Sequence, residues 1–233
     1  MNLSKSVVAL AMGSLFISTV CLAQSGIQVA EPAIEKFTTR SLGQTTQWIT
    51  DRFKSLPGFE QGKYGDKSSF RYAVSFDDCD MTITNTETGY SGKDQKIHGG
   101  KRPEIKFAYV KLQDLDVNTF ALNKNTNSLG LLLRSLDDKD VFKLLILGNV
   151  TPEDNAILKK FTVQGDAVGP DAKTGFEFGG KLINVYRYYS GNSYFRFQDV
   201  AVAESMQNAF KQAVTLCQRK AAEEKATAPD KRE

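Results

Sequence analysis

Alternating apolar and polar residues dominate the middle of the chain and predict β-strands. In "SFRYAVSF" every second residue from Phe70 to Phe76 is apolar, which is the period of a strand with one buried face. The turn Asp77-Asp78 leads into a second alternating run, so the two runs predict a hairpin. Further strands are predicted at 103–112, 115–122, 129–136, 141–148, 181–189 and 193–198.

Apolar residues spaced three and four apart predict helices on both sides of this strand region. Residues 45–56 carry Trp48 and Phe53 on one face, and Pro57 ends that helix. A longer helix of five or six turns is predicted after Asp199, its N-cap. Its buried stripe is expected to contain Val202, Met206, Phe210, Ala213, Val214 and Cys217.

Segments without a sustained period predict the connections. The expected loops are 60–69, 85–102 and 162–180, of which the last is expected to be mobile. Residues 149–161 predict a short helix capped by Thr151. Residues 24–38 are expected to be a linker, and the charged residues 223–233 a disordered tail.

Together these elements predict an α+β fold in a single domain, residues 39–222. We expect a strongly bent antiparallel sheet or partly open barrel of about seven to eight strands. The long C-terminal helix would cap its open end, and the N-terminal helix would dock on it by its apolar side. With 41% hydrophobic residues the chain can bury one core of this size.

The first 23 residues predict a secretory signal peptide. Lys5 precedes an apolar run from Val7 to Val20, and the small-residue end at Cys21-Leu22-Ala23 predicts cleavage after Ala23. The run is shorter than the roughly twenty residues of a membrane helix, and no second run of that length follows. We therefore expect a periplasmic or secreted protein without a transmembrane segment. A lipid anchor on Cys21 is the rival interpretation, which the bulky Val20 disfavours.

The charge of the chain argues against a polyanionic partner. The formal net charge is +3, and loss of Lys5 with the signal leaves about +2. Basic and acidic residues alternate along most segments, whereas nucleic-acid binding needs many Lys and Arg contacts to phosphate. Nucleic acid is therefore not an expected partner.

Cys79 and Cys217 are the two cysteines that remain after signal cleavage. Alternation places Cys79 on the inward face of its strand, and the helical stripe places Cys217 on the buried face of the last helix. Because export implies an oxidising compartment, we expect the two to form a disulfide. Two separately buried thiols are the main alternative. A reactive or metal-bound thiol is disfavoured by the acids Asp77, Asp78 and Asp80.

The order of strands followed by one long amphipathic helix resembles the pleckstrin-homology-like (PH-like) barrel. The segment "FRFQDVAVAESMQNAFKQAVTLC" is similar to the last strand and capping helix of such domains. The "LxDLD" strand at 112–116 also resembles a strand of uncharacterised secreted bacterial proteins. Pleckstrin-homology domains that bind inositol phosphates use Lys and Arg around the first hairpin. This chain has Asp77 and Asp78 there, so that ligand is not implied.

The residue types of common catalytic and metal sites are scarce. His98 is the single histidine, and the sequence has no Cys-x-x-Cys, His-Glu-x-x-His or Gly-x-Ser-x-Gly motif. Residues 114–118 imitate the start of a calcium loop, but Thr119 stands at the glycine position and Asn125 at the glutamate position. The sequence therefore predicts no catalytic residue, no cofactor and no metal.

Acidic residues leave one question open. Asp77, Asp78 and Asp80 at the predicted hairpin turn are the best candidates for a weak cation site or a general base. Together with Asp114 and Asp116 they are also the available acids for a hydrolase with paired carboxylates.

The strongest candidate for a binding surface is the predicted aromatic hairpin "VYRYYSGNSYFRF". Aromatic rings and guanidinium groups stack on sugars, bases and peptides. Aromatic residues are also common in strands without any ligand, because they stabilise the sheet. The candidate ligand-binding residues are Tyr186, Arg187, Tyr189, Tyr194 and Arg196.

We therefore expect an exported, non-enzymatic binding or structural module. Its expected partner is another envelope or extracellular protein, a peptide or an envelope polymer. A hydrolase with paired carboxylates and a carrier of a small hydrophobic ligand are the alternatives, although the bulky Phe70, Phe76 and Phe210 favour a filled interior over a hollow one.

Overall fold

The structure, a computed structural model, describes residues 34–63, 66–90, 104–125, 128–158 and 174–227. They belong to one compact unit that begins at Pro32. The predicted signal peptide, most of the predicted linker, His98 and residues 228–233 lie outside the described residues. No helix in the described ranges combines the length and the hydrophobicity that a membrane crossing requires.

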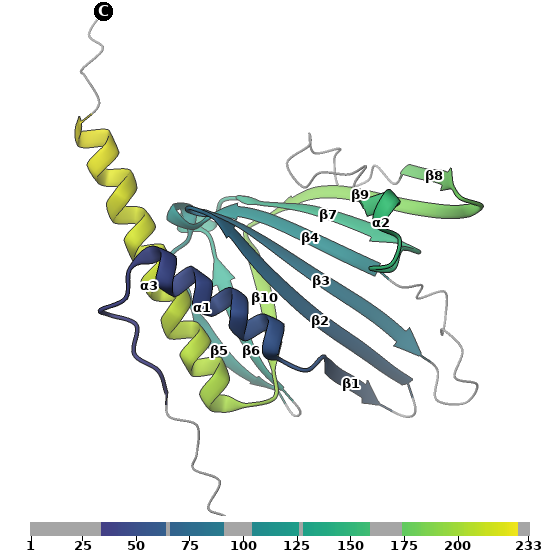
Figure 1. Cartoon of the computed structure of the whole chain (residues 1–233), viewed down its shortest axis with the longest axis horizontal. Helices are drawn as coiled ribbons and strands as arrows, with labels where there is room; N and C mark the ends of the chain where they lie inside the picture. Colours follow the sequence, from purple (N-terminus) through teal and green to yellow (C-terminus); the bar gives the residue numbers. More distant parts are fainter. Residues whose placement is uncertain (1–33, 64–65, 91–103, 126–127, 159–173, 228–233) are drawn as a thin grey trace, which may run out of the picture. The chain divides into compact units, whose positions relative to one another are not determined.

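In the described part of the chain, ten strands form two antiparallel sheets (Figure 1). The larger sheet, in the order β1-β2-β3-β4-β7-β9-β8, contains β1 (Phe59–Lys63), β2 (Asp66–Asp77), β3 (Asp80–Tyr90), β4 (Glu104–Lys111), β7 (Phe142–Gly148), β8 (Thr174–Phe178) and β9 (Lys181–Ser190). The smaller sheet, in the order β10-β6-β5, contains β5 (Ala121–Asn125), β6 (Ser128–Arg134) and β10 (Asn192–Phe197). The predicted α+β class with a bent antiparallel sheet is confirmed, with more strands than expected.

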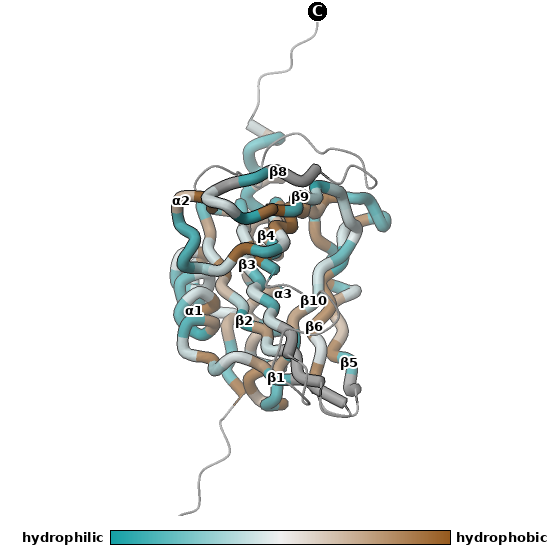
Figure 2. Tube along the Cα trace, turned by 90° about the vertical axis from the view of Figure 1, so that its right-hand side faces the viewer, coloured by the Kyte–Doolittle hydropathy of each residue, from teal (hydrophilic) through white to brown (hydrophobic). Residues whose placement is uncertain are grey.

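The chain passes between the two sheets at three short connections. The 3-10 turns η2 (Leu112–Asp114) and η3 (Val117–Thr119) lead from β4 to β5, and η4 (Leu136–Asp138) leads from β6 to β7. Gly191 alone separates β9 from β10. Figure 2 shows the larger sheet curving so that β2 and β3 lie across from β6 and β10. We call the side of the larger sheet that faces the smaller sheet its inner face.

Two helices cover part of the inner face. Helices α1 (Leu42–Ser55) and α3 (Val200–Thr227) lie side by side there (Figure 1). Ser41 and Gln44 form a capping box at the start of α1. The carboxylate of Asp199 accepts the Val202 N–H at 2.8 Å at the start of α3, as predicted. Helix α3 extends beyond residue 222, where the tail was expected to begin, as far as Thr227.

Residues that face one another across β2, β3 and β4 build the main core on the inner face. The first two rows are Phe76, Met81 and Val110, then Val74, Ile83 and Ala108. Against them pack Phe53 of α1, Phe195 of β10 and Phe210 of α3, with 5.5 Å between the ring centroids of Phe195 and Phe210. Phe37, in the segment predicted as a linker, is buried in the same core.

A second, smaller core lies on the outer face of the larger sheet, beneath α2 (Asn155–Leu158). Ile157 of α2 packs on Ile105, Leu145, Leu147, Ile183 and Val185. The predicted cap Thr151 is wrong, because the helix starts after Asp154, whose main-chain oxygen accepts the Leu158 N–H at 3.1 Å. The carboxylate of Asp154 instead accepts the Thr151 N–H at 2.9 Å.

The predicted pairing of Cys79 with Cys217 is confirmed. The two residues lie at disulfide distance, with their Cα atoms 5.7 Å apart. Both are buried, and the bond joins the β2–β3 turn to α3. The terminal helix is therefore held against the larger sheet across a sequence separation of 138 residues.

Several predicted loop boundaries are wrong. Strand β1 lies mostly in the expected loop 60–69, β3 continues through the first residues of 85–102, and β8 lies within the segment expected to be mobile. Strands β1 and β8 are the two edges of the larger sheet, so each pairs on one side only. The strand predicted at 115–122 is wrong except for its last two residues, which begin β5. The Asp116 carboxylate accepts the Asn118 N–H at 2.9 Å and starts η3.

Candidate functional site

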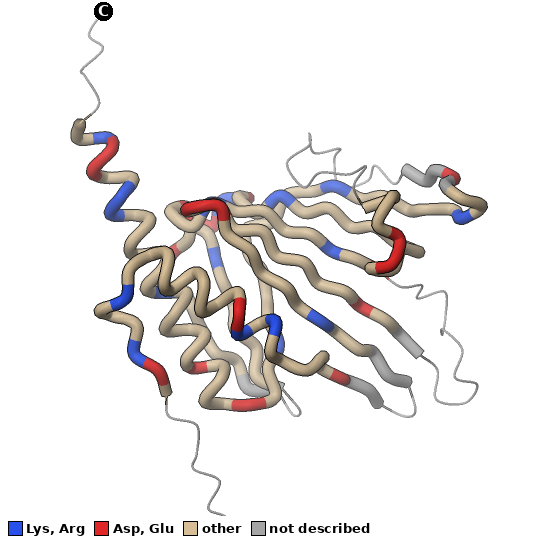
Figure 3. The backbone as a smooth tube through the Cα atoms, viewed as in Figure 1, with Lys and Arg blue, Asp and Glu red and all other residues tan. Residues whose placement is uncertain are grey.

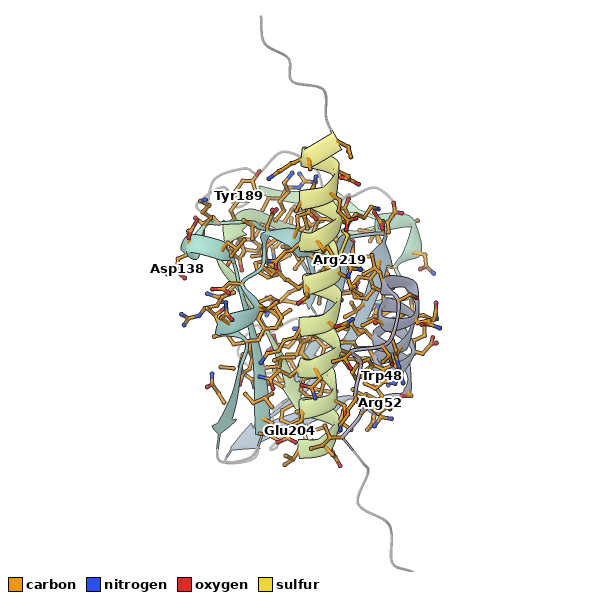
Figure 4. All side chains as sticks on the ribbon, turned by 90° about the vertical axis from the view of Figure 1, so that its left-hand side faces the viewer. Trp48, Arg52, Asp138, Tyr189, Glu204 and Arg219 are labelled. Atoms are coloured by element: carbon orange, nitrogen blue, oxygen red, sulfur yellow. A yellow bond between two sulfur atoms is a disulfide. The ribbon has the colours of Figure 1, made fainter. Side chains whose placement is uncertain are left out.

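The predicted aromatic hairpin is wrong, and its residues are divided between the two sheets. Strand β9 pairs with β7 and β8, whereas β10 pairs with β6. Within β9, Tyr186 stands opposite Ile146 and Arg187 opposite Leu145, so the two side chains lie on opposite faces. Tyr189 lies on the same outer face as Arg187, is 45% exposed, and is labelled in Figure 4.

Tyr194 and Arg196 of β10 approach β2. The Tyr194 ring lies directly over Gly130, where an added Cβ would meet the tyrosine hydroxyl at 1.5 Å. The Arg196 guanidinium lies 5.0 Å from the centroid of the Phe70 ring and 5.9 Å from that of Tyr194. Of the five predicted residues, Tyr186, Tyr194 and Arg196 therefore lie on the inner side of the molecule.

A polar row crosses the inner face next to the apolar core. Strand register aligns one residue from each of β2, β3, β4, β7 and β9 on this face. We call this row, in which Ile146 is the one apolar residue, the inner polar row: Tyr72, Asn85, Lys106, Ile146 and Tyr186. Each is half-buried, whereas Val74, Ile83 and Ala108, two residues further along their strands, are buried. On β2, β3 and β4 the inner face thus changes from a sealed core to a half-buried polar surface within two residues.

An ion cluster surrounds the Lys106 side chain of this row. The Lys106 ammonium is 2.8 Å from Glu87 and 3.5 Å from Glu104, and the side chains of Lys106 and Glu87 are only 32% and 13% exposed. Burial alone would lower the pKa of Lys106. The hydrogen bond and charge of Glu87, together with Glu104, outweigh burial and raise that pKa above its ordinary value. The ammonium is therefore a fixed positive charge on the inner face.

Tyr72 connects the inner polar row to the smaller sheet. Burial raises its pKa to about 12, against the opposing charge of Arg196 and a hydrogen bond with the Arg196 backbone, and the charge of Glu87 adds to the increase. The Tyr72 hydroxyl consequently stays protonated at physiological pH. These interactions bring Arg196, Glu87 and Tyr194 around one hydroxyl group, although they come from different sheets.

Asn85 carries an unmet hydrogen-bond acceptor in the middle of the row. Its Oδ1 atom is buried and has no partner among the residues that the structure describes. An acceptor left without a partner costs about 1–3 kcal/mol, and buried polar atoms of folded proteins are normally satisfied. The Oδ1 atom is also closed to solvent, so no donor from outside the chain reaches it in this arrangement.

The acids at the β2–β3 turn form a separate site near the disulfide. Asp77, Asp78 and Asp80 line a hollow of about 300 Å³ together with Lys111 and Lys220, and Lys220 pairs with Asp78. Burial, a hydrogen bond to Asp80 and the charges of Asp80, Asp114 and Asp77 raise the pKa of the nearby Tyr109 to about 12. Within the described ranges, no group of three His, Cys, Asp or Glu residues is placed to hold a metal ion.

Two further hollows flank the helices. One of about 520 Å³ lies between residues 38–42 and the α3 residues Gln212, Leu216 and Arg219. Arg219 is labelled on α3 in Figure 4. The other, of about 110 Å³, is mostly apolar and places Arg196 beside Phe59 and Val202. Figure 3 shows both signs of charge along the exposed end of α3.

Sequence reasoning missed Asn85, Glu87 and Lys106. Asn85 and Glu87 fall in a segment predicted to be a loop, although threonines recur at every second position from Thr82 to Thr88. That period-two spacing of a β-branched residue was the available signal for a longer strand. No feature of the sequence near Lys106 indicated that it pairs with Glu87 of the neighbouring strand.

The comparisons with known proteins add no relative. No family model matches the chain, and no curated protein or solved structure is significantly similar to it.

Proposed function

We propose that this protein is an exported binding module that holds its ligand on the inner polar row. The observation that carries the proposal is the placement of Tyr72, Asn85 and Lys106 on the inner face of the sheet, directly beside the sealed core. Export is proposed from the signal-like sequence 1–23, and the disulfide-distance cysteine pair is compatible with it. The resemblance of the fold to a PH-like barrel remains a proposal.

If stability were the only requirement, the inner polar row would be unfavourable. Burying charged and amide groups requires partners for each of them, and apolar side chains of similar volume are often as stable or more stable in such positions. Here Asn85 keeps an unmet acceptor, and Lys106 needs two carboxylates. A ligand that binds the accessible parts of this half-buried row would give the arrangement a purpose that folding does not.

The arrangement supports binding better than hydrolysis or carriage of an apolar ligand. The acids predicted for a hydrolase include Asp77, Asp78 and Asp80, but Lys111 and Lys220 line the same hollow, and Lys220 pairs with Asp78. An apolar carrier requires an empty interior, whereas the packed rings of Phe53, Phe195 and Phe210 fill this one.

Two tyrosines of β9 test the proposal against its nearest alternative. Tyr186→Ala removes a ring from the inner polar row, and Tyr189→Ala removes an exposed ring from the outer face of the same strand. We expect retention of the protein, without residues 1–23, on envelope material of its source to fall about tenfold with Tyr186→Ala and to be unchanged with Tyr189→Ala.

Thermal unfolding of both variants serves as the control for folding, and Tyr186→Phe replaces Tyr186→Ala if the latter unfolds. Loss of retention with Tyr189→Ala alone would place the binding surface on the outer face and overturn the proposal. Equal retention by wild type and all three variants would also overturn it.

A further inference from the structure

We propose that the Cys79–Cys217 disulfide is a site of thiol–disulfide exchange in the folded protein, where an uncharged or cationic thiol attacks Cys79 and Cys217 leaves. The proposal is independent of ligand binding at the inner polar row. Three observations carry it: the hollow beside the bond, the different charges next to the two sulfurs, and the different exposure of the two cysteines.

The hollow at the β2–β3 turn lies beside the disulfide. Both cysteines line it, and both also belong to the main core, so the bond lies where that core meets the hollow. The volume of about 300 Å³ is at the lower end of the range of about 300–1,000 Å³ that is usual for small-molecule pockets. A small thiol therefore has room to approach the bond while the protein stays folded.

The charges next to the two sulfurs differ. Cys79 stands between Asp78 and Asp80 in the chain. Cys217 is followed three positions later by Lys220, which lies on the same face of α3 and also lines the hollow. A nearby ammonium stabilises a thiolate, whereas nearby carboxylates destabilise one. When the bond breaks, the negative charge is therefore more stable on Cys217 than on Cys79.

Exposure favours the same direction of attack. Cys79 is 9% exposed and Cys217 only 1%. Exchange requires the incoming sulfur to reach the sulfur that it attacks, and it proceeds faster when the leaving sulfur forms the more stable thiolate. Access and leaving group thus both favour attack on Cys79.

The lining also selects the charge of the thiol. Among the described residues, its charged members are four acids and two lysines: Asp77, Asp78, Asp80, Glu224, Lys111 and Lys220. Two of the acids are the chain neighbours of the sulfur that is attacked. Carboxylates this close repel an anionic thiol and attract a cationic one, and salt screens both effects.

The exchange needs two thiols. The first thiolate bonds to Sγ of Cys79, and the electron pair of the broken bond leaves on Sγ of Cys217, which then takes up a proton. The second thiolate attacks the thiol-derived sulfur of this mixed disulfide and releases Cys79. In total the protein disulfide gains two electrons and two protons, and the two thiols are oxidised to one disulfide.

The test measures reduction of the folded protein by cationic cysteamine, uncharged 2-mercaptoethanol and anionic mercaptoacetate. Each rate constant is divided by that of the same thiol acting on 2-hydroxyethyl disulfide, so that intrinsic reactivity cancels. At low salt we expect the normalised constant of cysteamine to exceed that of mercaptoacetate about tenfold, and high salt should reduce this ratio. Acid quenching and peptide mapping should find the first added thiol on Cys79.

Two pairs of variants assign the effect to the hollow. Asp77→Asn should raise the normalised constant of mercaptoacetate about threefold, whereas Asp137→Asn, at an exposed acid outside the lining, should not change it. Lys220→Gln should slow 2-mercaptoethanol about threefold, because the Cys217 thiolate loses its ammonium. Lys225→Gln, further along α3 and outside the lining, should have no such effect.

Urea distinguishes exchange in the folded protein from reduction after unfolding. Urea below the unfolding transition should leave the rate constants unchanged, because the folded protein is the reactant. Rate constants that rise steeply with urea would show that the thiols react only with unfolded chains, and would overturn the proposal. Equal normalised constants for the three thiols, a first added thiol on Cys217, or a disulfide that no thiol reduces would overturn it as well.

Discussion

The ion pair of Lys106, in the inner polar row, should contribute measurably to the free energy of unfolding. Replacement of Lys106 by Met removes the ammonium that lies 2.8 Å from the Glu87 carboxylate, whose side chain is only 13% exposed. Loss of a partner for a mostly buried charge is costly, so we expect the free energy of unfolding to fall by about 1–2 kcal/mol. Urea denaturation followed by circular dichroism measures this change.

Lys139→Met is the matched control for that prediction. Lys139 pairs with Asp137 at 3.2 Å, but the two side chains are 69% and 78% exposed. Exposed ion pairs contribute little, so this variant should change the free energy of unfolding by less than about 0.5 kcal/mol. Equal effects of the two substitutions would show that the Lys106 cluster is as solvated as a surface pair.

The raised pKa values of Tyr72 and Tyr109 predict a loss of stability at alkaline pH. The fold raises the pKa of each hydroxyl from 10.0 to about 12. Below pH 10 both states are protonated and stability is unaffected. Above pH 10 the unfolded chain ionises first, so the free energy of unfolding should fall by about 1.4 kcal/mol per tyrosine at pH 11.

The phenylalanine variants isolate this effect from the rest of the molecule. Tyr72→Phe and Tyr109→Phe should each flatten the decline between pH 10 and pH 12, as measured by urea denaturation at a series of pH values. A decline that is as steep in both variants as in wild type would contradict the assignment of these two groups.

For single residues, the sequence predicts the features that follow from the spacing of apolar residues alone. Alternation and the helical stripe were enough to turn Cys79 and Cys217 inward, and the two meet in the structure. Asn85 could not be recognised in the same way, because its role depends on Tyr72 and Lys106 on neighbouring strands. Register between strands is set by nonlocal packing, which a single sequence does not display.

Among the elements, β6 and β10 depend on one glycine. The Tyr194 ring occupies the space where a side chain of residue 130 would stand, so Gly130→Ala must displace that ring. We expect a loss of about 1–3 kcal/mol in the free energy of unfolding, measured by urea denaturation, together with weaker ligand retention. In a Tyr194→Ala background the same substitution should cost less than about 0.5 kcal/mol.

Gly43→Ala provides the control for this substitution. Gly43 lies in α1 with open space around the position of a Cβ atom. Alanine favours a helix over glycine by up to about 1 kcal/mol, so this variant should be unchanged or more stable. A Gly130→Ala protein as stable as wild type, with Tyr194 in place, would contradict the proposed packing of the two strands.

Element prediction succeeded where pattern was strong and failed where pairing was decided at a distance. The alternation of β2 and β4 and the apolar run of β7 were enough to predict strands there. The turn at Gly191 suggested a hairpin of β9 and β10. Phe195 and Phe197 are instead buried against α1 and α3, which places β10 in the smaller sheet. Burial of those two rings outweighs the local preference for pairing with β9.

For the molecule as a whole, the disulfide determines how firmly α3 closes the core. Removal of both sulfurs in Cys79→Ser with Cys217→Ser frees a loop spanning 138 residues. Chain-entropy arguments and measured disulfide deletions give a loss of about 2–5 kcal/mol in the free energy of unfolding. Thermal and urea unfolding of the double variant measure the loss, and a stability equal to that of wild type would show that α3 docks without the bond.

The account as a whole requires the inner face to be sealed at Ala108 and open at Lys106, two residues apart on the same face of β4. The most direct test introduces a single thiol in Lys106→Cys or Ala108→Cys and measures its rate of labelling by a maleimide in the folded protein. The account predicts rapid labelling at position 106, where the side chain is 32% exposed, and labelling at position 108, where the residue is 5% exposed, only on unfolding. Equal protection of the two thiols would contradict it, because the inner polar row would then be closed to any ligand.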